Sequence, residues 1–173
     1  KIAEENKFGF KDIRITLEKK INYENYEFLK SKNVTFRKAK LGDFKTLKKI
    51  AKNSYLESRY YFDNLFELQK VKNFYIGWLK KAILGTFDSF CLLICYKQKP
   101  VGYCTLKLES SSASIGLFSI SKNFQGRGFS KLLLSAVDLQ MKKLNINNLT
   151  VVTQGRNYSA LKAYQNSRFK ISR

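Results

Sequence analysis

The chain has 173 residues, and 33 Lys and Arg against 13 Asp and Glu give it a formal net charge of +20 at pH 7. Hydrophobic residues make up 44% of the sequence and aromatic residues 14%, which is enough apolar surface for a folded core and excludes a disordered basic tail. The absence of His excludes Ser-His-Asp and Cys-His nucleophile systems and His-ligated zinc sites, and no metal site is expected.

The first half of the chain alternates between strand and helix patterns. Asp43 offers a helix start, because its carboxylate can accept a free backbone N–H, and Gly85 ends a later helical pattern. The elements expected from hydrophobic periodicity are a strand over residues 12–18, a polar connection over 19–33, a strand over 34–39, and helices over 44–54 and 68–82.

The second half begins with strands and then changes period. The break at residues 97–100 joins two apolar runs, as a hairpin does. The expected elements are strands over residues 89–96, 101–108 and 113–120, a helix over 133–144, a strand over 149–154 and a helix over 157–167. This order predicts an α+β fold with a mixed, mostly antiparallel sheet flanked by helices.

Composition also bears on partners and location. A surface this basic attracts phosphates, but the Lys excess also fits an AT-rich genome, and both interpretations remain open at this point. Cys91 and Cys95 would lie about 13 Å apart on a strand at ~3.3 Å per residue, too far for a disulfide. We therefore expect these cysteines and Cys104 to be buried reduced thiols in a cytoplasmic protein. No apolar run is long enough to span a membrane.

The most informative segment is the glycine-rich, basic loop over residues 120–130, which joins a strand to a helix. Such a loop can direct backbone N–H groups and the helix dipole at one anion, and phosphate binds well there. Gly126 and Gly128 allow close approach of the backbone, and Arg127 adds charge. A plain strand-to-helix turn is the structural alternative.

This loop resembles the signature of the GNAT superfamily of acyl-CoA-dependent N-acyltransferases, Gln/Arg-x-x-Gly-x-Gly/Ala. Gln125 and Gly128 match it, and Ser130 replaces the last Gly or Ala. A second block, Asn157 followed by Tyr164, is similar to the family's Asn-x-x-Ala-x-x-x-Tyr helix. Without the glycine loop, Asn157 would be interpreted as a helix cap and Tyr164 as a core aromatic.

The resemblance implies acetyl-CoA as cosubstrate, with its pyrophosphate on the loop amides and its pantetheine along the preceding strand. It implies that Tyr164 is the catalytic acid that protonates the departing thiolate. The residues implied to bind the cofactor are Phe118, Ser119, Ile120, Gln125, Gly126, Arg127, Gly128, Phe129, Ser130 and Asn157.

Several further segments are similar to the dTDP-fucosamine acetyltransferases, a group that acetylates nucleotide-activated amino sugars for surface polysaccharide. They include residues 9–18, 58–63 and 152–157. The residues implied to bind the substrate are Ser58, Arg59, Tyr60, Asp63 and Gln154. An ordinary loop with aromatic anchors is the alternative for residues 58–63.

The expected reaction is direct transfer of the acetyl group to a neutral amine, with backbone donors near Ile120 polarising the thioester carbonyl. With no His, the base is water, a backbone carbonyl, or a carboxylate such as Asp63 or Glu57, and the choice stays open. The alternatives for function are acetylation of a protein N-terminus or another amine, a basic nucleic-acid-binding module, and a CoA-binding domain without turnover.

We expect residues 1–33 to form an N-terminal extension with one strand and residues 34–173 to form the GNAT domain. The first residue is Lys1 instead of Met, and the chain stops at Arg173 before the closing strands that GNAT domains normally have. The intact protein is therefore expected to be longer, and a homodimer through those strands is possible in the family. Arg168 stands where the family places a Gly after the last helix, at a left-handed position.

Overall fold

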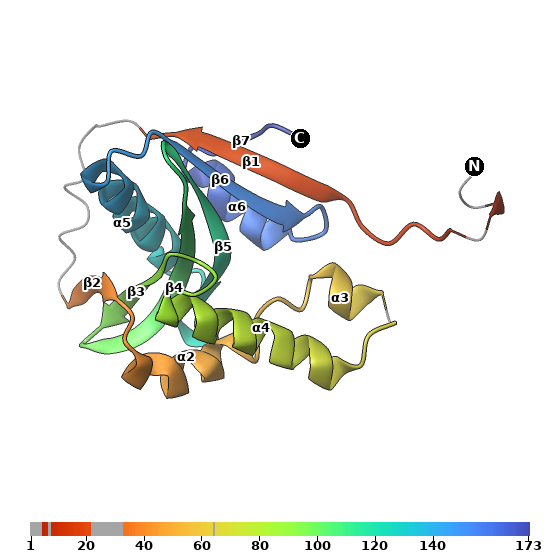
Figure 1. Ribbon diagram of the computed structural model, residues 1–173, viewed down its shortest axis with the longest axis horizontal. Helices are drawn as coiled ribbons and strands as arrows, with labels where there is room; N and C mark the ends of the chain where they lie inside the picture. The colour runs from red at the N-terminus through yellow and green to blue at the C-terminus, as the bar shows by residue number, and fades with distance from the viewer. Residues whose placement is uncertain (1–4, 7, 22–32, 64) are drawn as a thin grey trace.

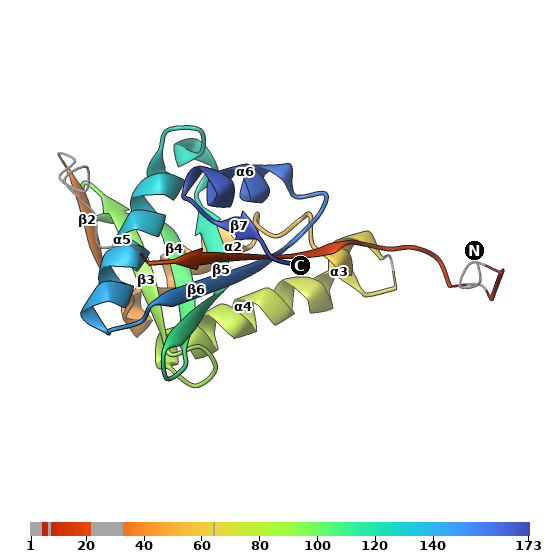
Figure 2. The same ribbon diagram turned by 90° about the horizontal axis from the view of Figure 1, so that it is seen from above.

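A seven-stranded sheet forms the centre of the computed structural model, which describes residues 5–6, 8–21, 33–63 and 65–173. Figures 1 and 2 show helices on both faces of this sheet, with α2 and α4 on one face and α5 and α6 on the other. The strands are β1 (Arg14–Lys20), β2 (Val34–Lys38), β3 (Phe90–Tyr96), β4 (Lys99–Leu108), β5 (Ser112–Ile120), β6 (Asn148–Gln154) and β7 (Lys170–Ile171). The helices are α2 (Phe44–Ala51), α3 (Arg59–Phe62), α4 (Leu68–Leu84), α5 (Phe129–Lys143) and α6 (Tyr158–Asn166), with short 3-10 turns η2 (Leu41–Asp43) and η3 (Lys122–Phe124).

The sheet has the strand order β2-β3-β4-β5-β6-β1-β7. All neighbouring strands are antiparallel except β5 and β6, which are parallel, so the predicted mixed α+β sheet is confirmed. β1, which belongs to the segment expected as an N-terminal extension, pairs with β6 from Arg14↔Gln154 to Lys20↔Asn148. A polar connection was predicted over residues 19–33, but β1 continues to Lys20, so the connection starts two residues later. Most of the remainder, residues 22–32, lies outside the described residues.

A short strand follows the last helix, where the sequence was expected to stop before any closing strand. Arg168 has a φ of 69°, the left-handed conformation expected at that position. This turn buries Phe169 and brings β7 alongside β1 at Leu17 and Glu18. After α6 the structure thus contains one two-residue strand, β7.

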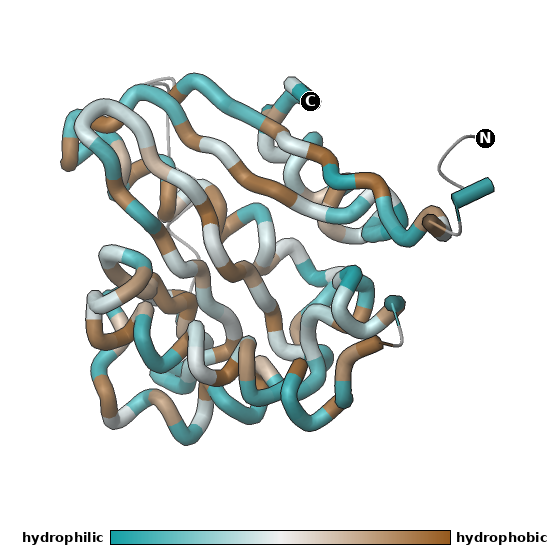
Figure 3. Tube along the Cα trace, turned by 45° about the vertical axis from the view of Figure 1, so that its right-hand side comes forward, coloured by the Kyte–Doolittle hydropathy of each residue, from teal (hydrophilic) through white to brown (hydrophobic). Residues whose placement is uncertain are grey.

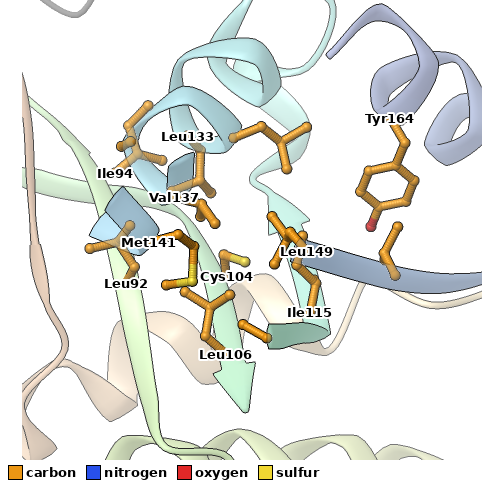
Figure 4. Packing of buried hydrophobic residues seen from close by; sticks show 14 of the residues in the cluster. Leu92, Ile94, Cys104, Leu106, Ile115, Leu133, Val137, Met141, Leu149 and Tyr164 are labelled. Atoms are coloured by element: carbon orange, nitrogen blue, oxygen red, sulfur yellow. The ribbon is translucent and has the colours of Figure 1, made fainter. Parts of the chain in front are cut away.

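Two hydrophobic cores form, one on each face of the sheet. The first lies under α5 and α6 and contains Leu133, Val137 and Met141 of α5 against alternate residues of the strands (Figure 4). The second lies under α2 and α4 and contains Leu47 and Leu79. In Figure 3 hydrophobic positions along the strands are separated by near-neutral ones, and the helices change between hydrophilic and hydrophobic residues, as the burial of a single helix face requires.

Local differences from the predicted elements have simple causes. α2 ends at Ala51 instead of residue 54, because the next backbone N–H groups, those of Asn53 and Ser54, bond the carbonyls of Ile50 and Ala51 three residues earlier and so form tighter turns. Asp43 accepts a backbone N–H from Lys40 at 2.8 Å and pairs with both terminal nitrogens of Arg37 at 2.7 Å, so it stabilises the 3-10 turn before α2. α3 lies within a stretch expected to be a loop.

The three cysteines are free and buried, as predicted. Burial raises the pKa of the Cys91 and Cys104 thiols, so these groups are protonated. Within the described ranges, no helix has both the length and the apolar character needed to cross a membrane.

Candidate acyltransfer site

The parallel strands β5 and β6 separate partway along their length. Their register runs from Ser112↔Asn148 to Ile115↔Val151, whereas the strands themselves continue to Ile120 and Gln154. In Figure 1 the two strands diverge beyond this point. An unpaired strand edge therefore opens between β5 and β6, and such an edge can receive a ligand that pairs with backbone groups.

A β-bulge in β5 coincides with this opening. Cys104 pairs with Phe118 and Leu106 with Ile115, so Gly116 and Leu117 together lie opposite the single residue Thr105. The Leu117 N–H donates to Thr105 Oγ1 at 2.7 Å instead of to a backbone carbonyl. Because a bulge bends its strand, it directs β5 away from β6.

The hydrogen-bond alternation of β4 and β5 fixes which groups face the open edge. Ser121 N donates to Val101 O at 2.8 Å, so Ser121 and Ser119 direct their backbone groups at β4. By alternation, Phe118 and Ile120 direct theirs away from β4 and into the opening. The Ile120 carbonyl there accepts a hydrogen bond from Gln125 Nε2 at 2.9 Å, while its N–H points the same way.

Tyr164 reaches the opening from α6. Its ring lies edge-on to Phe118 of β5, with 5.9 Å between the centroids, and also contacts Phe169. Figure 4 shows the side chain extending from α6 towards β6 with the hydroxyl leading. Burial raises the pKa of this hydroxyl above its ordinary value, and nearby Cys104 adds to the shift, so Tyr164 holds its proton.

The glycine loop leads from the open edge to the N-terminus of α5. Gly126 and Gly128 have φ values of 70° and 82°, which glycine adopts without steric cost. A Cβ at either position would meet no atom within 4 Å, so the glycines are needed for backbone conformation and not to avoid a protein neighbour. Arg127 is exposed and lies over the Phe124 ring at 5.6 Å. The first N–H groups of α5, which an α-helix leaves without a partner inside the helix, thus begin next to a cation.

Asn157 serves as a helix cap. Its Oδ1 accepts the N–H of Ala160 at 3.1 Å and thereby begins α6. The helix cap that the sequence offered as the alternative for this residue is therefore present. The cap also fixes the start of the helix that carries Tyr164.

The residues predicted to bind substrate lie around α3 and the end of β6. Ser58 is buried at the start of α3, while the Arg59 guanidinium is exposed and lies over the Tyr60 ring at 4.9 Å. Asp63 forms an ion pair with Lys11 at 3.2 Å. Gln154 is the last residue of β6 and is half-buried.

Arg156 connects α3 to the segment that precedes β1. Its guanidinium lies over the Phe62 ring at 3.5 Å, donates to the Lys11 carbonyl, and is 3.4 Å from Asp12 Oδ1. Gly155 N donates to Ile13 O at 2.8 Å. The segment before β1, α3 and the β6–α6 loop therefore form one continuous wall at this end of the sheet. This wall could not be predicted from the sequence, since its parts are more than 40 residues apart.

Comparisons with known proteins agree with this geometry. The sequence pattern described as "Acetyltransferase (GNAT) family" matches residues 51–168, so the chain belongs to the GNAT family of acetyltransferases. A curated relative, dTDP-fucosamine acetyltransferase of Escherichia coli O6:H1, is 29% identical over 124 residues, which are 70% of this chain and 52% of the relative. The chain thus spans about half the length of that relative.

Solved structures share the fold at low sequence identity. A PaiA N-acetyltransferase from Thermoplasma acidophilum in complex with coenzyme A has a TM-score of 0.68 and 18% identity, over 80% of this chain and 91% of that one. The ribosomal-protein-S18-alanine N-acetyltransferase of Escherichia coli has a TM-score of 0.58 and 12% identity, over 81% and 79% of the two chains. These likenesses confirm the predicted GNAT fold.

Proposed function

We propose that the protein is an acetyl-CoA-dependent N-acetyltransferase that transfers the acetyl group directly to an amine. The observation that carries this proposal is the open edge between β5 and β6, with Tyr164 against Phe118 on one side and the glycine loop at its end. Together these features offer a strand edge for an amide-bearing chain, donors for a phosphate, and a protonated phenol at one place.

The cofactor residues fit acetyl-CoA by their chemistry. The N–H groups at the start of α5, with Arg127 beside them, would hold the pyrophosphate. The backbone groups of Phe118 and Ile120 would pair with the pantetheine amides and donate to the thioester carbonyl. Gln125 would keep the loop closed through its hydrogen bond to Ile120. The small side chain of Ser130, in the first turn of α5, keeps this surface accessible.

Tyr164 supplies the proton that the departing thiolate needs. The reaction forms a C–N bond and breaks the C–S bond, the amine nitrogen loses one proton, and the sulfur gains one. Because the Tyr164 pKa is raised by burial, the phenol is protonated throughout the neutral and mildly alkaline range. The Asp63 carboxylate is engaged in an ion pair with Lys11, so we infer that water takes the amine proton.

We infer that the acceptor is the amine of a nucleotide-activated sugar. The curated relative supports this class, and the wall around α3 offers groups that suit it. Tyr60, Phe66 and Phe74 form an aromatic cluster with centroid separations of 5.4 Å, and the exposed Arg59 lies over Tyr60. Aromatic faces stack on bases, and an arginine fork matches a phosphate.

A thiol-release assay tests the proposal. The purified protein with acetyl-CoA is offered dTDP-fucosamine, and in a parallel reaction a peptide with a free N-terminal alanine. Thiol release with the sugar nucleotide but not the peptide is the expected result. Thiol release with the peptide alone would show that the acceptor is a peptide amine and not a sugar nucleotide. Thiol release with neither amine, together with no binding of acetyl-CoA, would contradict the enzymatic function.

A further inference from the structure

Two hydroxyl pairs join the segment after α2 to the strands at the open edge. Ser54 Oγ and Ser119 Oγ are 2.6 Å apart, and the hydroxyls of Tyr55 and Tyr103 are 2.8 Å apart. Ser54 and Tyr55 are consecutive, and Tyr103 and Ser119 face each other in the β4–β5 register. Two consecutive residues after α2 therefore form hydrogen bonds with the two residues of one cross-strand pair in the sheet.

The direction of the serine pair follows from counting protons. Ser54 Oγ donates its proton to the Ile50 carbonyl at 2.8 Å. The hydrogen bond between the two serines must then be donated by Ser119. A serine hydroxyl has one proton and two lone pairs, so towards any further group Ser119 can only accept.

Ser119 lies on the part of β5 that is no longer paired with β6, and its side chain is directed at the face of the sheet that α2 covers. Tyr164 approaches the same part of β5 from the opposite face, where it contacts Phe118. Ser119 and Tyr164 thus flank the open edge from opposite sides.

The backbone at Tyr55 is held in an unfavourable conformation. A φ of 65° is rare for a bulky residue and persists only where its surroundings determine it. Here the ring of Tyr55 stacks on Tyr75 with 4.6 Å between centroids, and its hydroxyl is bonded to the fully buried Tyr103. This anchoring fixes the position of Ser54, and Ser54 in turn fixes the proton of Ser119.

We propose that Ser119 accepts a hydrogen bond from the N–H of the attacking amine, and that Ser54, Tyr55 and Tyr103 are positioning residues that keep its hydroxyl acceptor-only. This inference rests on the proposed function. A neutral amine must direct its lone pair at the acetyl carbon, so an acceptor at the side of the nitrogen orients it. A hydroxyl free to rotate would instead donate to that lone pair and oppose attack.

The test compares Ser119→Ala with Ser114→Ala, a matched serine on the paired part of the same strand. With whichever of dTDP-fucosamine or the alanine peptide the wild-type protein acetylates, Ser119→Ala should lower kcat/KM for the amine ~10-fold, the effect of one lost hydrogen bond. The Kd for acetyl-CoA should stay within two-fold of wild type. Ser119→Thr, which restores a hydroxyl, should recover most of the loss, and Ser114→Ala should match wild type.

Ser54→Ala tests the positioning role without altering β5, and it also serves if Ser119→Ala does not fold. It frees the Ser119 proton, so we expect a several-fold lower kcat with an unchanged Kd for acetyl-CoA. Unchanged amine kinetics in folded Ser119→Ala, or in Ser54→Ala, would overturn this inference while leaving the proposed function intact. A wild-type protein that neither binds acetyl-CoA nor acetylates either amine would overturn both.

Discussion

Tyr164 of α6 lies edge-on to Phe118 of β5, with ring centroids 5.9 Å apart, at the place where β5 has separated from β6. A helix and a strand edge thereby present a protonated phenol and free backbone donors to the same space. This relationship links a sequence motif to a chemical role, because the motif fixes the helix position while the bulge in β5 creates the space.

Replacing Tyr164 by Phe removes the hydroxyl that we propose as the proton donor and keeps the ring contacts with Phe118 and Phe169. We expect kcat to fall by about 100-fold or more, within the range for a lost general acid, with little change in the Kd for acetyl-CoA. Steady-state kinetics and calorimetry check this. Tyr158→Phe is the control, since Tyr158 is on the same helix and 79% exposed, and a Tyr164→Phe enzyme with full turnover would remove Tyr164 from the mechanism.

The pH dependence of the reaction follows from the state of Tyr164. The acceptor ammonium must lose its proton before attack, so kcat/KM should rise with pH. Burial raises the pKa of Tyr164 above its ordinary 10.0, so its acid form persists and no fall in activity should appear up to about pH 10. A kcat/KM profile in overlapping buffers checks this, and a descending limb near pH 8 that vanishes in Tyr164→Phe would show that the phenol titrates lower.

The glycine loop is sensitive to backbone conformation. Gly128→Ala places a Cβ on a residue with φ 82°, which costs about 1–2 kcal/mol and displaces the amides at the start of α5. We expect weaker acetyl-CoA binding and a lower free energy of unfolding, measured by calorimetry and chemical denaturation. Gly77→Ala in α4, where a Cβ has open space, should instead stabilise the protein by up to about 1 kcal/mol without affecting binding. Equal behaviour of the two variants would argue against a special role for the loop.

A buried ion pair connects β1 to α5 away from the site. Lys19 and Asp138 are both largely buried and in direct contact, and Lys19 also lies over the Phe169 ring at 5.6 Å. Asp138→Ala should lower the free energy of unfolding by about 3–5 kcal/mol, because it leaves the Lys19 charge buried without its partner. The double variant Lys19→Met, Asp138→Leu should recover most of this loss in urea denaturation. If the single and the double variant lose the same free energy of unfolding, the loss in Asp138→Ala does not come from an unpaired Lys19 charge, and the explanation is contradicted.

Much of the fold could be predicted because its elements are local in sequence. The break at residues 97–100, Gly85 and the change of period after Gly128 mark their own boundaries. The left-handed turn at Arg168 was also anticipated, but β7 was not, since a two-residue strand has no periodicity. The bulge opposite Thr105 could not be predicted from the sequence either, because it depends on the pairing of two strands.

The candidate site was predicted in part for the same reason. The glycine loop, Asn157 and Tyr164 belong to short motifs, so their types and spacing carry a signal. Ser54 and Tyr55 belong to no motif, and only tertiary packing brings them to Ser119 and Tyr103. The family resemblance assigned Ser119 to the cofactor, but its side chain faces α2 and its backbone groups face β4, so the groups directed at the open edge are those of Phe118 and Ile120.

Calorimetric titration of acetyl-CoA into the protein tests the central claim most directly, because every role assigned to the open edge and the glycine loop depends on this ligand. We expect one molecule to bind per chain, with binding weakened in Gly128→Ala and retained in Tyr164→Phe. Absence of detectable binding by the folded wild-type protein would contradict the account.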